Sequence, residues 1–167
     1  VAKWSLKAVE YVKTNTQATV EFYSNASGRP RDWWRELGLM LSARVGGRDR
    51  HYRQNDLGIF SIDGLEKTNV LYRRHTNFEK IMENAAAFIE AGGIARWDFI
   101  VFEHNQHQVD AARARAKEMG FKEFRLRKTA RFNFSPLGPD EWPVYSSKGN
   151  LEYTIRPPTI PEYRNHE

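Results

Sequence analysis

The stretch FEKIMENAAAFIEAGGIARWDFIVF (78–102) decides the fold, because it joins a helix to a buried strand. Apolar residues recur at helical spacing through its first half and predict a helix over 76–91. Thr76 and Glu79 form a capping box that opens this helix, and the Gly-Gly pair closes it. Residues 97–102 are almost all apolar, which is typical of a strand covered on both faces in a parallel sheet.

The same alternation of strand and helix extends to both sides of this stretch. Strands are predicted at 18–23, 57–62, 97–102 and 122–128, and further helices at 1–14, from Asp32 to Leu41 with Asp32 as its cap, and at 105–119 with Asn105 as its cap. Strands separated by helices form right-handed β-α-β units. We therefore expect an α/β fold: an open parallel sheet of about four strands in chain order, with outer helices and with 76–91 and 105–119 on one face.

The chain is 167 residues long, which is enough for one hydrophobic core. Its organisation changes near residue 132, because the segment 133–167 holds six of the seven prolines and has little apolar periodicity. We expect an irregular tail there, with one hairpin around 147–150. No segment resembles a targeting peptide or a membrane span, so no membrane partner is expected and the cytoplasm is the default compartment.

Cysteine is absent from the chain, whose net charge is +5. The sequence therefore offers no disulfide, no thiolate zinc site and no cysteine ligand for an iron–sulfur cluster, and we expect the isolated chain to bind no iron. His104 and His107 lack a third fixed ligand, so no metal site is assigned. Two basic clusters are candidates for phosphate contacts, with a solvated surface as the alternative: Arg44, Arg48, Arg50 and Arg53, and Arg125, Arg127, Lys128 and Arg131.

Polar segments follow each of the four predicted strands. They are Ser24 to Ser27, Ser61 to Gly64, Glu103 to Gln106, and Lys128 to Arg131. Because ligands of parallel α/β sheets bind at the carboxyl ends of the strands, these segments are the candidate site. Their hydroxyl, amide and carboxylate groups suit a ligand with a ribose and an amino-acid end, and Arg73, Arg74 or Arg131 is a candidate for its carboxylate. The alternative is that such residues only form the turns.

Three long segments resemble radical S-adenosylmethionine (radical SAM) enzymes of the SPASM-associated subgroup. They are SNASGRPRDWWRELG (24–38), the run from Phe60 to Phe132, and EWPVYSSKGNLEYTIRPP (141–158). The resemblance implies that 1–132 is the later half of a partial (β/α)6 TIM-like barrel, and that 133–167 leads toward an auxiliary domain. It also implies S-adenosylmethionine as cofactor, with a [4Fe–4S] cluster that generates a 5′-deoxyadenosyl radical for hydrogen abstraction in the complete enzyme.

The resemblance assigns cofactor-binding roles to residues at the strand ends: Ser24, Asn25, Ser61, Asp63, Arg74, Asn105 and Gln106. Arg74 is the residue placed to meet the methionyl carboxylate, and Asp63 is expected to face the mouth of the sheet. The sequence departs from the family in having Ala26 where glycine is usual, and in lacking the cluster cysteines. We therefore expect a chain that is truncated at both ends, has no catalytic residue of its own and is inactive in radical chemistry.

Three functions stay open at this point. The first is a portion of a radical SAM enzyme. The second is a non-catalytic remnant that binds S-adenosylmethionine, a related nucleoside or only a protein partner. The third is a basic nucleic-acid-associated module that uses the two arginine clusters. An open sheet also leaves its first and last strands unpaired, so we expect a homo-oligomer or a complementary chain to cover them.

Overall fold

The computed structural model describes residues 4–42 and 56–164, and the basic cluster from Arg44 to Arg53 lies outside the described residues. The elements are α1 Ser5–Asn15, β1 Glu21–Ser24, α2 Arg31–Ser42, β2 Leu57–Ser61, α3 Glu66–Tyr72, α4 Phe78–Glu90, β3 Ala95–Ile100, η2 Gln106–Gln108, α5 Val109–Glu118, β4 Glu123–Arg127, η3 Arg131–Phe134, β5 Trp142–Tyr145, β6 Leu151–Ile155 and α6 Pro161–Arg164.

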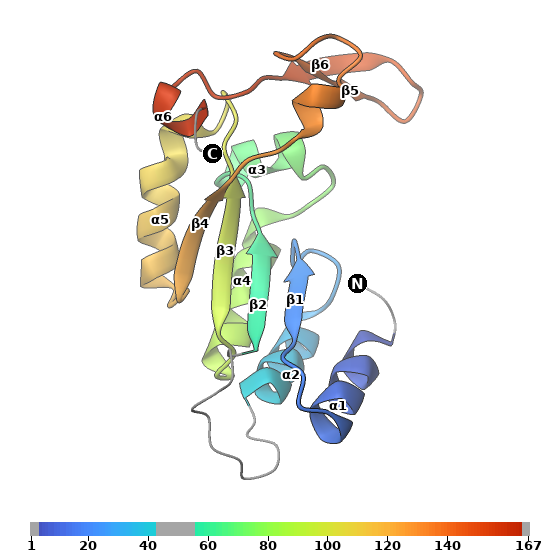
Figure 1. Ribbon diagram of the computed structural model, residues 1–167, viewed down its shortest axis with the longest axis vertical. Helices are drawn as coiled ribbons and strands as arrows, with labels where there is room; N and C mark the ends of the chain where they lie inside the picture. Colours follow the sequence, from blue (N-terminus) through green and yellow to red (C-terminus); the bar gives the residue numbers. More distant parts are fainter. Residues whose placement is uncertain (1–3, 43–55, 165–167) are drawn as a thin grey trace.

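Four parallel strands form the central sheet in the order β1-β2-β3-β4 (Figure 1). This order confirms the predicted α/β fold with an open sheet of four strands. The boundaries of β3 differ from the prediction, since the strand covers 95–100 rather than 97–102. Its residues are buried from Ala95 to Phe99, but within the described residues only one face is covered by helices. Arg96 and Asp98 on the other face are buried as an ion pair, which corrects the expectation of a strand covered on both faces.

One face of the sheet packs against the helices. Phe60 of β2 contacts Trp34 of α2 and Phe88 of α4, with ring centroids 5.4 Å apart in both pairs. On the same face, Phe124 of β4 lies under the guanidinium of Arg113 from α5. Helices α2, α4 and α5 therefore share one side of the sheet, which confirms the expected placement of 76–91 and 105–119.

Helices α2 and α4 approach each other closely at Gly38. A β-carbon at this position would collide with the backbone carbonyl of Phe88, so α2 can reach α4 only because residue 38 is glycine. The close packing buries Trp34 and Phe88 almost completely. Trp33 is partly buried and packs against the same core.

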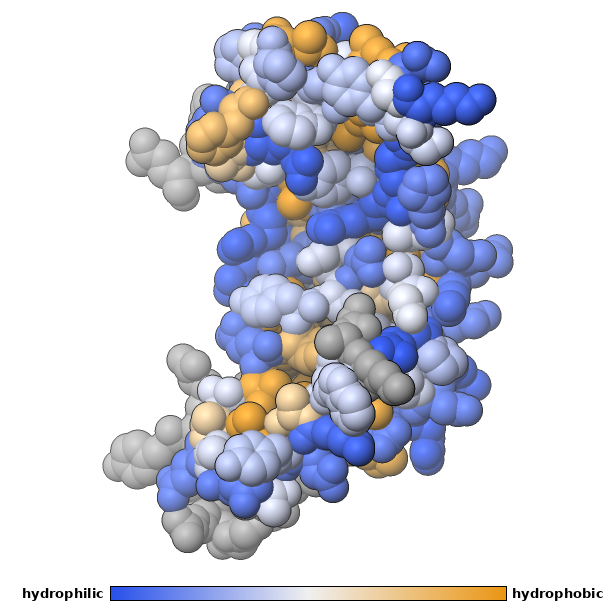
Figure 2. Space-filling model, turned by 90° about the vertical axis from the view of Figure 1, so that its right-hand side faces the viewer, coloured by the Kyte–Doolittle hydropathy of each residue, from blue (hydrophilic) through white to orange (hydrophobic). Residues whose placement is uncertain are grey.

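The opposite face of the sheet, called here the open face, carries polar side chains. Strand alternation and register place Tyr23, Ser61, Arg96 and Asp98 on it. No helix among the described residues covers this face. Figure 2 shows the molecule from the β1 edge, with a hollow on the side of the open face where mostly hydrophilic residues gather.

Two of the three predicted helix caps are wrong, and the third holds in position only. The cap of α4 is Asn77, whose side chain accepts a 2.9 Å hydrogen bond from Lys80 N, whereas Thr76 lies in the preceding turn. Helix α2 starts at Arg31, one residue before Asp32, because Pro30 already fixes the chain at that point. Asn105 is the N-cap residue of η2 but makes no capping bond, since its side chain bonds to the backbone of Asp63, Ile100 and Phe102.

The segment after β4 is better ordered than expected. Strands β5 and β6 form an antiparallel hairpin whose turn includes Lys148 and Gly149, which confirms the hairpin predicted there. A small second core beneath the hairpin contains Phe102, Phe132 and Ile155. The division of the chain at residue 132 stays a prediction. No helix in the described ranges is both long enough and apolar enough to cross a membrane.

Candidate functional site

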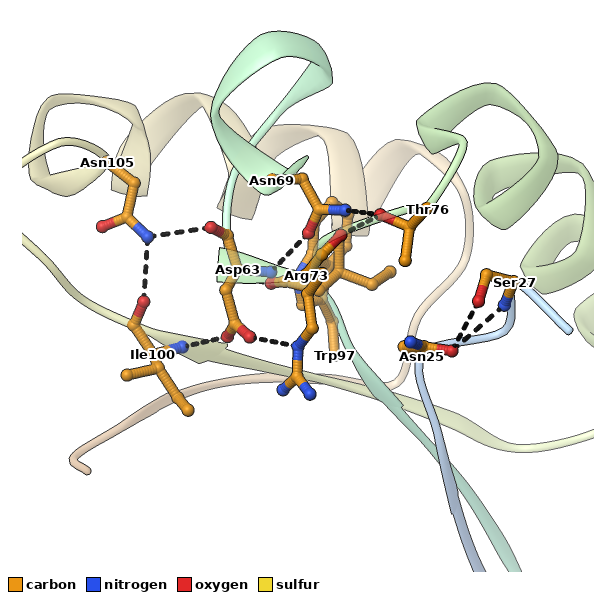
Figure 3. Close-up of polar contacts among 10 residues, drawn as sticks. Asn25, Ser27, Asp63, Asn69, Arg73, Thr76, Trp97, Ile100 and Asn105 are labelled. Atoms are coloured by element: carbon orange, nitrogen blue, oxygen red, sulfur yellow. Dashed lines mark hydrogen bonds and ion pairs between the residues drawn. The ribbon is translucent and has the colours of Figure 1, made fainter. Parts of the chain in front are cut away.

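Asp63 lies at the centre of the polar network at the carboxyl end of β2 (Figure 3). Its side chain is fully buried, and its two oxygens accept 2.6 Å hydrogen bonds from Arg73 Nε and Ile100 N. Burial raises the pKa of Asp63, while the Arg73 charge and the Ile100 N–H oppose that shift. The expectation of a carboxylate facing the mouth of the sheet is therefore corrected, because both oxygens already have partners inside the chain.

A tight turn and helix α3 bring Arg73 to this carboxylate. Gly64 has φ of +145°, and a β-carbon there would lie 2.7 Å from Asn69 N. Asn69, which is fully buried, accepts a 3.0 Å hydrogen bond from Asp63 N and donates a 3.1 Å bond to Thr76. Thr76 in turn donates to the carbonyl of Arg73. This closed ring of hydrogen bonds fixes the residue that follows α3.

A cavity of about 540 Å³ opens at the carboxyl ends of β1 and β2. Its polar lining includes Ser24, Asn25, Ser61 and Arg73. Three of the seven predicted cofactor-binding residues therefore meet at one cavity. The guanidinium of Arg73 is the only charged group in this lining among the described residues. Its terminal nitrogens make no hydrogen bond to the part of the chain that the structure describes.

The turn after β1 orients the amide of Asn25. Asn25 Oδ1 accepts hydrogen bonds from Ser27 N at 3.2 Å and Ser27 Oγ at 2.9 Å. The amide nitrogen consequently points away from Ser27, on the side of Arg73 (Figure 3). Ala26 has φ of +57°, a backbone conformation that costs an alanine about 1 kcal/mol and a glycine almost nothing. This conformation explains why glycine suits the position better.

Arg73 lines the cavity, whereas Arg74, the residue expected to meet the methionyl carboxylate, does not. Arg74 donates a 2.6 Å hydrogen bond to the carbonyl of Tyr145 and lies 2.7 Å from the carboxylate of Glu152. Both partners belong to the hairpin, so Arg74 anchors that hairpin and does not line the cavity. The reason is local: α3 ends at Tyr72, and consecutive side chains beyond a helix end point in different directions.

Asn105 and Gln106 also lie outside the cavity. Asn105 is buried and donates 2.9 Å hydrogen bonds to the carbonyls of Asp63 and Ile100, which ties the end of β2 to the end of β3. Gln106 bonds through both amide atoms to Thr159 and through its oxygen to Ile160 N, which fastens the tail. Both side chains are thus used by the fold.

Charged side chains continue across the open face below the cavity. Arg96 and Asp98 form a buried 2.8 Å ion pair, and Arg127 lies 3.6 Å from the same carboxylate. Tyr23 donates a 2.7 Å hydrogen bond to Glu21, which raises the pKa of its phenol. The face is therefore internally neutralised over much of its width, and Arg73 is the charged residue that lines the cavity at the ends of β1 and β2.

His104 is half-buried and stacks on Phe102, with ring centroids 5.3 Å apart. Burial lowers the pKa of His104 to about 4, with a smaller contribution from His107. A neutral imidazole can bind metal, but no group of three ligating side chains capable of holding a metal ion exists within residues 4–42 and 56–164.

Comparison with known proteins supplies a structural relative. No family model matches the sequence. No curated protein matches it either. The structure is similar to that of anSMEcpe with bound AdoMet and the Cp18Cys peptide, with a TM-score of 0.56 and 16% identity over 92% of this chain. A second structure of anSMEcpe, with bound AdoMet, gives a TM-score of 0.52 and 17% identity over 84% of the chain.

The chain has a radical-SAM-like fold. It spans 33–38% of the length of the two anSMEcpe chains, so the likeness concerns a part of that architecture. The predicted fold class is confirmed, including its relation to a partial TIM-like barrel.

Proposed function

We propose that the cavity at the ends of β1 and β2 binds S-adenosylmethionine, and that Arg73 receives its methionyl carboxylate. The observation that supports this proposal is that the nitrogens of the Arg73 guanidinium have different surroundings. Nε is fixed by the buried Asp63, while the terminal nitrogens stay available at a cavity whose other polar lining groups are hydroxyls and one amide. An arginine held in this way is preorganised for a carboxylate.

The remaining lining suits the polar parts of the same ligand. Asn25 offers an amide N–H, and Ser24 and Ser61 offer hydroxyl groups that can donate or accept. These groups match an ammonium, a ribose and a carboxylate. Asp63 does not touch the ligand in this account: it is a positioning residue that acts through Arg73. The structural relative anSMEcpe binds AdoMet, which supports the choice of ligand.

The iron–sulfur cluster of the family does not fit this chain. The sequence has no cysteine, so none of its residues offers the thiolate ligands of such a cluster. S-Adenosylmethionine supplies a carbon–sulfur bond that radical SAM enzymes cleave with an electron from that cluster. We therefore propose a cofactor-holding portion of a radical SAM protein and derive no radical step from this chain.

Calorimetric titration with S-adenosylmethionine tests the proposal, using two neighbouring arginines as a matched pair. Arg73→Gln removes a charge-assisted bond of about 1.5–3 kcal/mol and is expected to weaken binding at least about tenfold. Arg74→Gln removes the same charge one residue away, but leaves the cavity intact and is expected to bind as the wild type does. Arg73→Lys keeps a positive charge beside Asp63 but lacks the terminal guanidinium nitrogens. This variant is expected to bind S-adenosylmethionine weakly.

Thermal melts accompany each titration, because loss of Arg73 leaves a buried carboxylate without its partner. A wild type that does not bind S-adenosylmethionine contradicts the proposal. Equal weakening by Arg73→Gln and Arg74→Gln in folded variants would also overturn it, because only overall charge would then matter.

A further inference from the structure

A second cavity, of about 290 Å³, lies between the end of α3 and the β5–β6 hairpin. Its lining includes three arginines, Arg73, Arg74 and Arg131, and three large aromatic residues, Tyr72, Trp142 and Tyr145. No aspartate or glutamate belongs to this lining. Arg73 is paired with Asp63 and Arg74 with Glu152, so among the described residues the unpaired positive charge of this cavity is that of Arg131, which the cofactor proposal does not use.

Arg131 is the distinctive group of this cavity. Its guanidinium lies 5.2 Å from the ring centre of Tyr72 and 4.8 Å from that of Trp142. Its side chain makes no hydrogen bond or ion pair with any residue in the described ranges. Arg74, by contrast, is neutralised by Glu152 at 2.7 Å. Arg131 is thus positioned by aromatic contacts alone and keeps its hydrogen-bonding capacity free.

The aromatic support of Arg131 is itself rigid. Tyr72 packs on the buried Phe102, with ring centroids 4.6 Å apart, and carries the guanidinium of Arg73 at 5.1 Å. Two guanidinium groups therefore contact the same tyrosine ring. A contact of this kind uses the face of a guanidinium, so the N–H edge of Arg131 stays available. Arg73 differs, because its Nε is bonded to Asp63 and its terminal nitrogens serve the neighbouring cavity. The Arg131 edge, in a lining that contains no carboxylate, is therefore the receptor for an anion.

We propose that this cavity, called here the arginine cleft, binds a carboxylate or phosphate group of a second ligand, with Arg131 as the principal contact. Arg73 lines both this cleft and the neighbouring cavity. The arginine cleft is therefore positioned to hold the anionic group of a substrate beside the cofactor. The assignment to a substrate rests on the proposed function, whereas anion binding by the cleft does not.

Trp142 provides a direct readout of this site. We would titrate the chain with inorganic phosphate, and separately with succinate, at constant ionic strength. The fluorescence of Trp142 is obtained by subtracting the signal of the Trp142→Phe variant from that of the wild type. A saturable change with either probe is expected. The probe that binds more tightly identifies the anionic group as phosphate or carboxylate.

Two arginine variants make the test specific. Arg131→Gln is expected to weaken anion binding about tenfold or more, the loss of one charge-assisted contact. Arg113→Gln is the matched control, since Arg113 also lies over an aromatic ring, that of Phe124 at 5.0 Å, but belongs to α5. It is expected to bind within about twofold of the wild type, as its charge is screened.

No saturable change with either probe overturns the proposal, and so does equal weakening by the two variants. The outcome is separable from that of the cofactor proposal. Phosphate or succinate binding without S-adenosylmethionine binding defeats the cofactor proposal alone. S-Adenosylmethionine binding without binding of either anion defeats the arginine cleft alone.

Discussion

Replacing Asp63 with asparagine removes the charge that fixes Arg73 while preserving the shape of the side chain. The asparagine oxygen can still accept the bond from Ile100 N, so the main loss is the 2.6 Å contact with Arg73 Nε. A hydrogen bond between charged groups contributes about 1.5–3 kcal/mol. The Arg73 side chain is 26% exposed and can partly rehydrate, which keeps the loss below that of a fully buried pair.

We therefore expect Asp63→Asn to lower the free energy of unfolding by about 2 kcal/mol, equivalent to a Tm decrease of about 4–8 °C for a chain of this size. Urea denaturation followed by circular dichroism measures it. The matched control is Asp140→Asn, because Asp140 pairs with Arg164 at the same 2.6 Å, but with side chains 66% and 52% exposed. The control should lose less than about 1 kcal/mol.

The same Asp63→Asn variant should weaken S-adenosylmethionine binding, because Arg73 is released from its fixed orientation. An unchanged melt would refute the reasoning, since it would mean that Asp63 carries no charge in the native chain. Equal losses for Asp63→Asn and Asp140→Asn would refute it too, because burial would then add nothing to the pair.

Three further outcomes are expected. Gly38→Ala should destabilise the chain by about 1–3 kcal/mol in urea melts, because its β-carbon collides with the Phe88 carbonyl; a neutral effect would contradict the close contact of α2 and α4. The free energy of unfolding should fall as pH drops from about 6.5 to about 4, because the unfolded chain protonates His104 over that range and the folded chain does not; His104→Gln should flatten this dependence, and an unaltered slope would argue against it. Light scattering should give a mass of more than one chain, because β1 and β4 each have a free edge within the described sheet; a monodisperse monomer would count against pairing at those edges.

The sequence predicts the sheet well because periodicity and chirality restrict it strongly. Short apolar strands alternating with amphipathic helices permit few arrangements other than parallel strands in chain order. Helix starts were predicted poorly because several polar residues near each start could serve as caps. Thr76 and Asn77 are adjacent, and only the three-dimensional position of Asn69 shows that Thr76 is used elsewhere.

The candidate site could be predicted only in part. Polar residues at strand ends mark where a site can form, and Ser24, Asn25 and Ser61 do line one cavity. The sequence does not show which polar side chains are already hydrogen-bonded to other parts of the fold. Asn105 and Gln106 connect strands and tail, and this becomes visible only from partners that lie far away in the chain.

The choice between Arg73 and Arg74 was also beyond the sequence, because both follow the same short helix, which was itself not predicted. Asn69 is the residue that sequence reasoning missed most clearly. It is a fully buried asparagine in α3, and the sequence does not single it out, because it directly follows three other polar residues, 66–68. Its partners, Asp63 and Thr76, show that it organises the turn carrying Arg73.

The most direct test of the account is nuclear magnetic resonance of the ¹⁵N-labelled chain during titration with S-adenosylmethionine. We predict shifts at the Asn25 side-chain amide, the Ser61 backbone amide and the Arg73 Nε–H, with the Gln106 side-chain amide unmoved. Shifts centred on Gln106, or no shifts at saturating ligand, would contradict the placement of the cofactor between β1, β2 and Arg73.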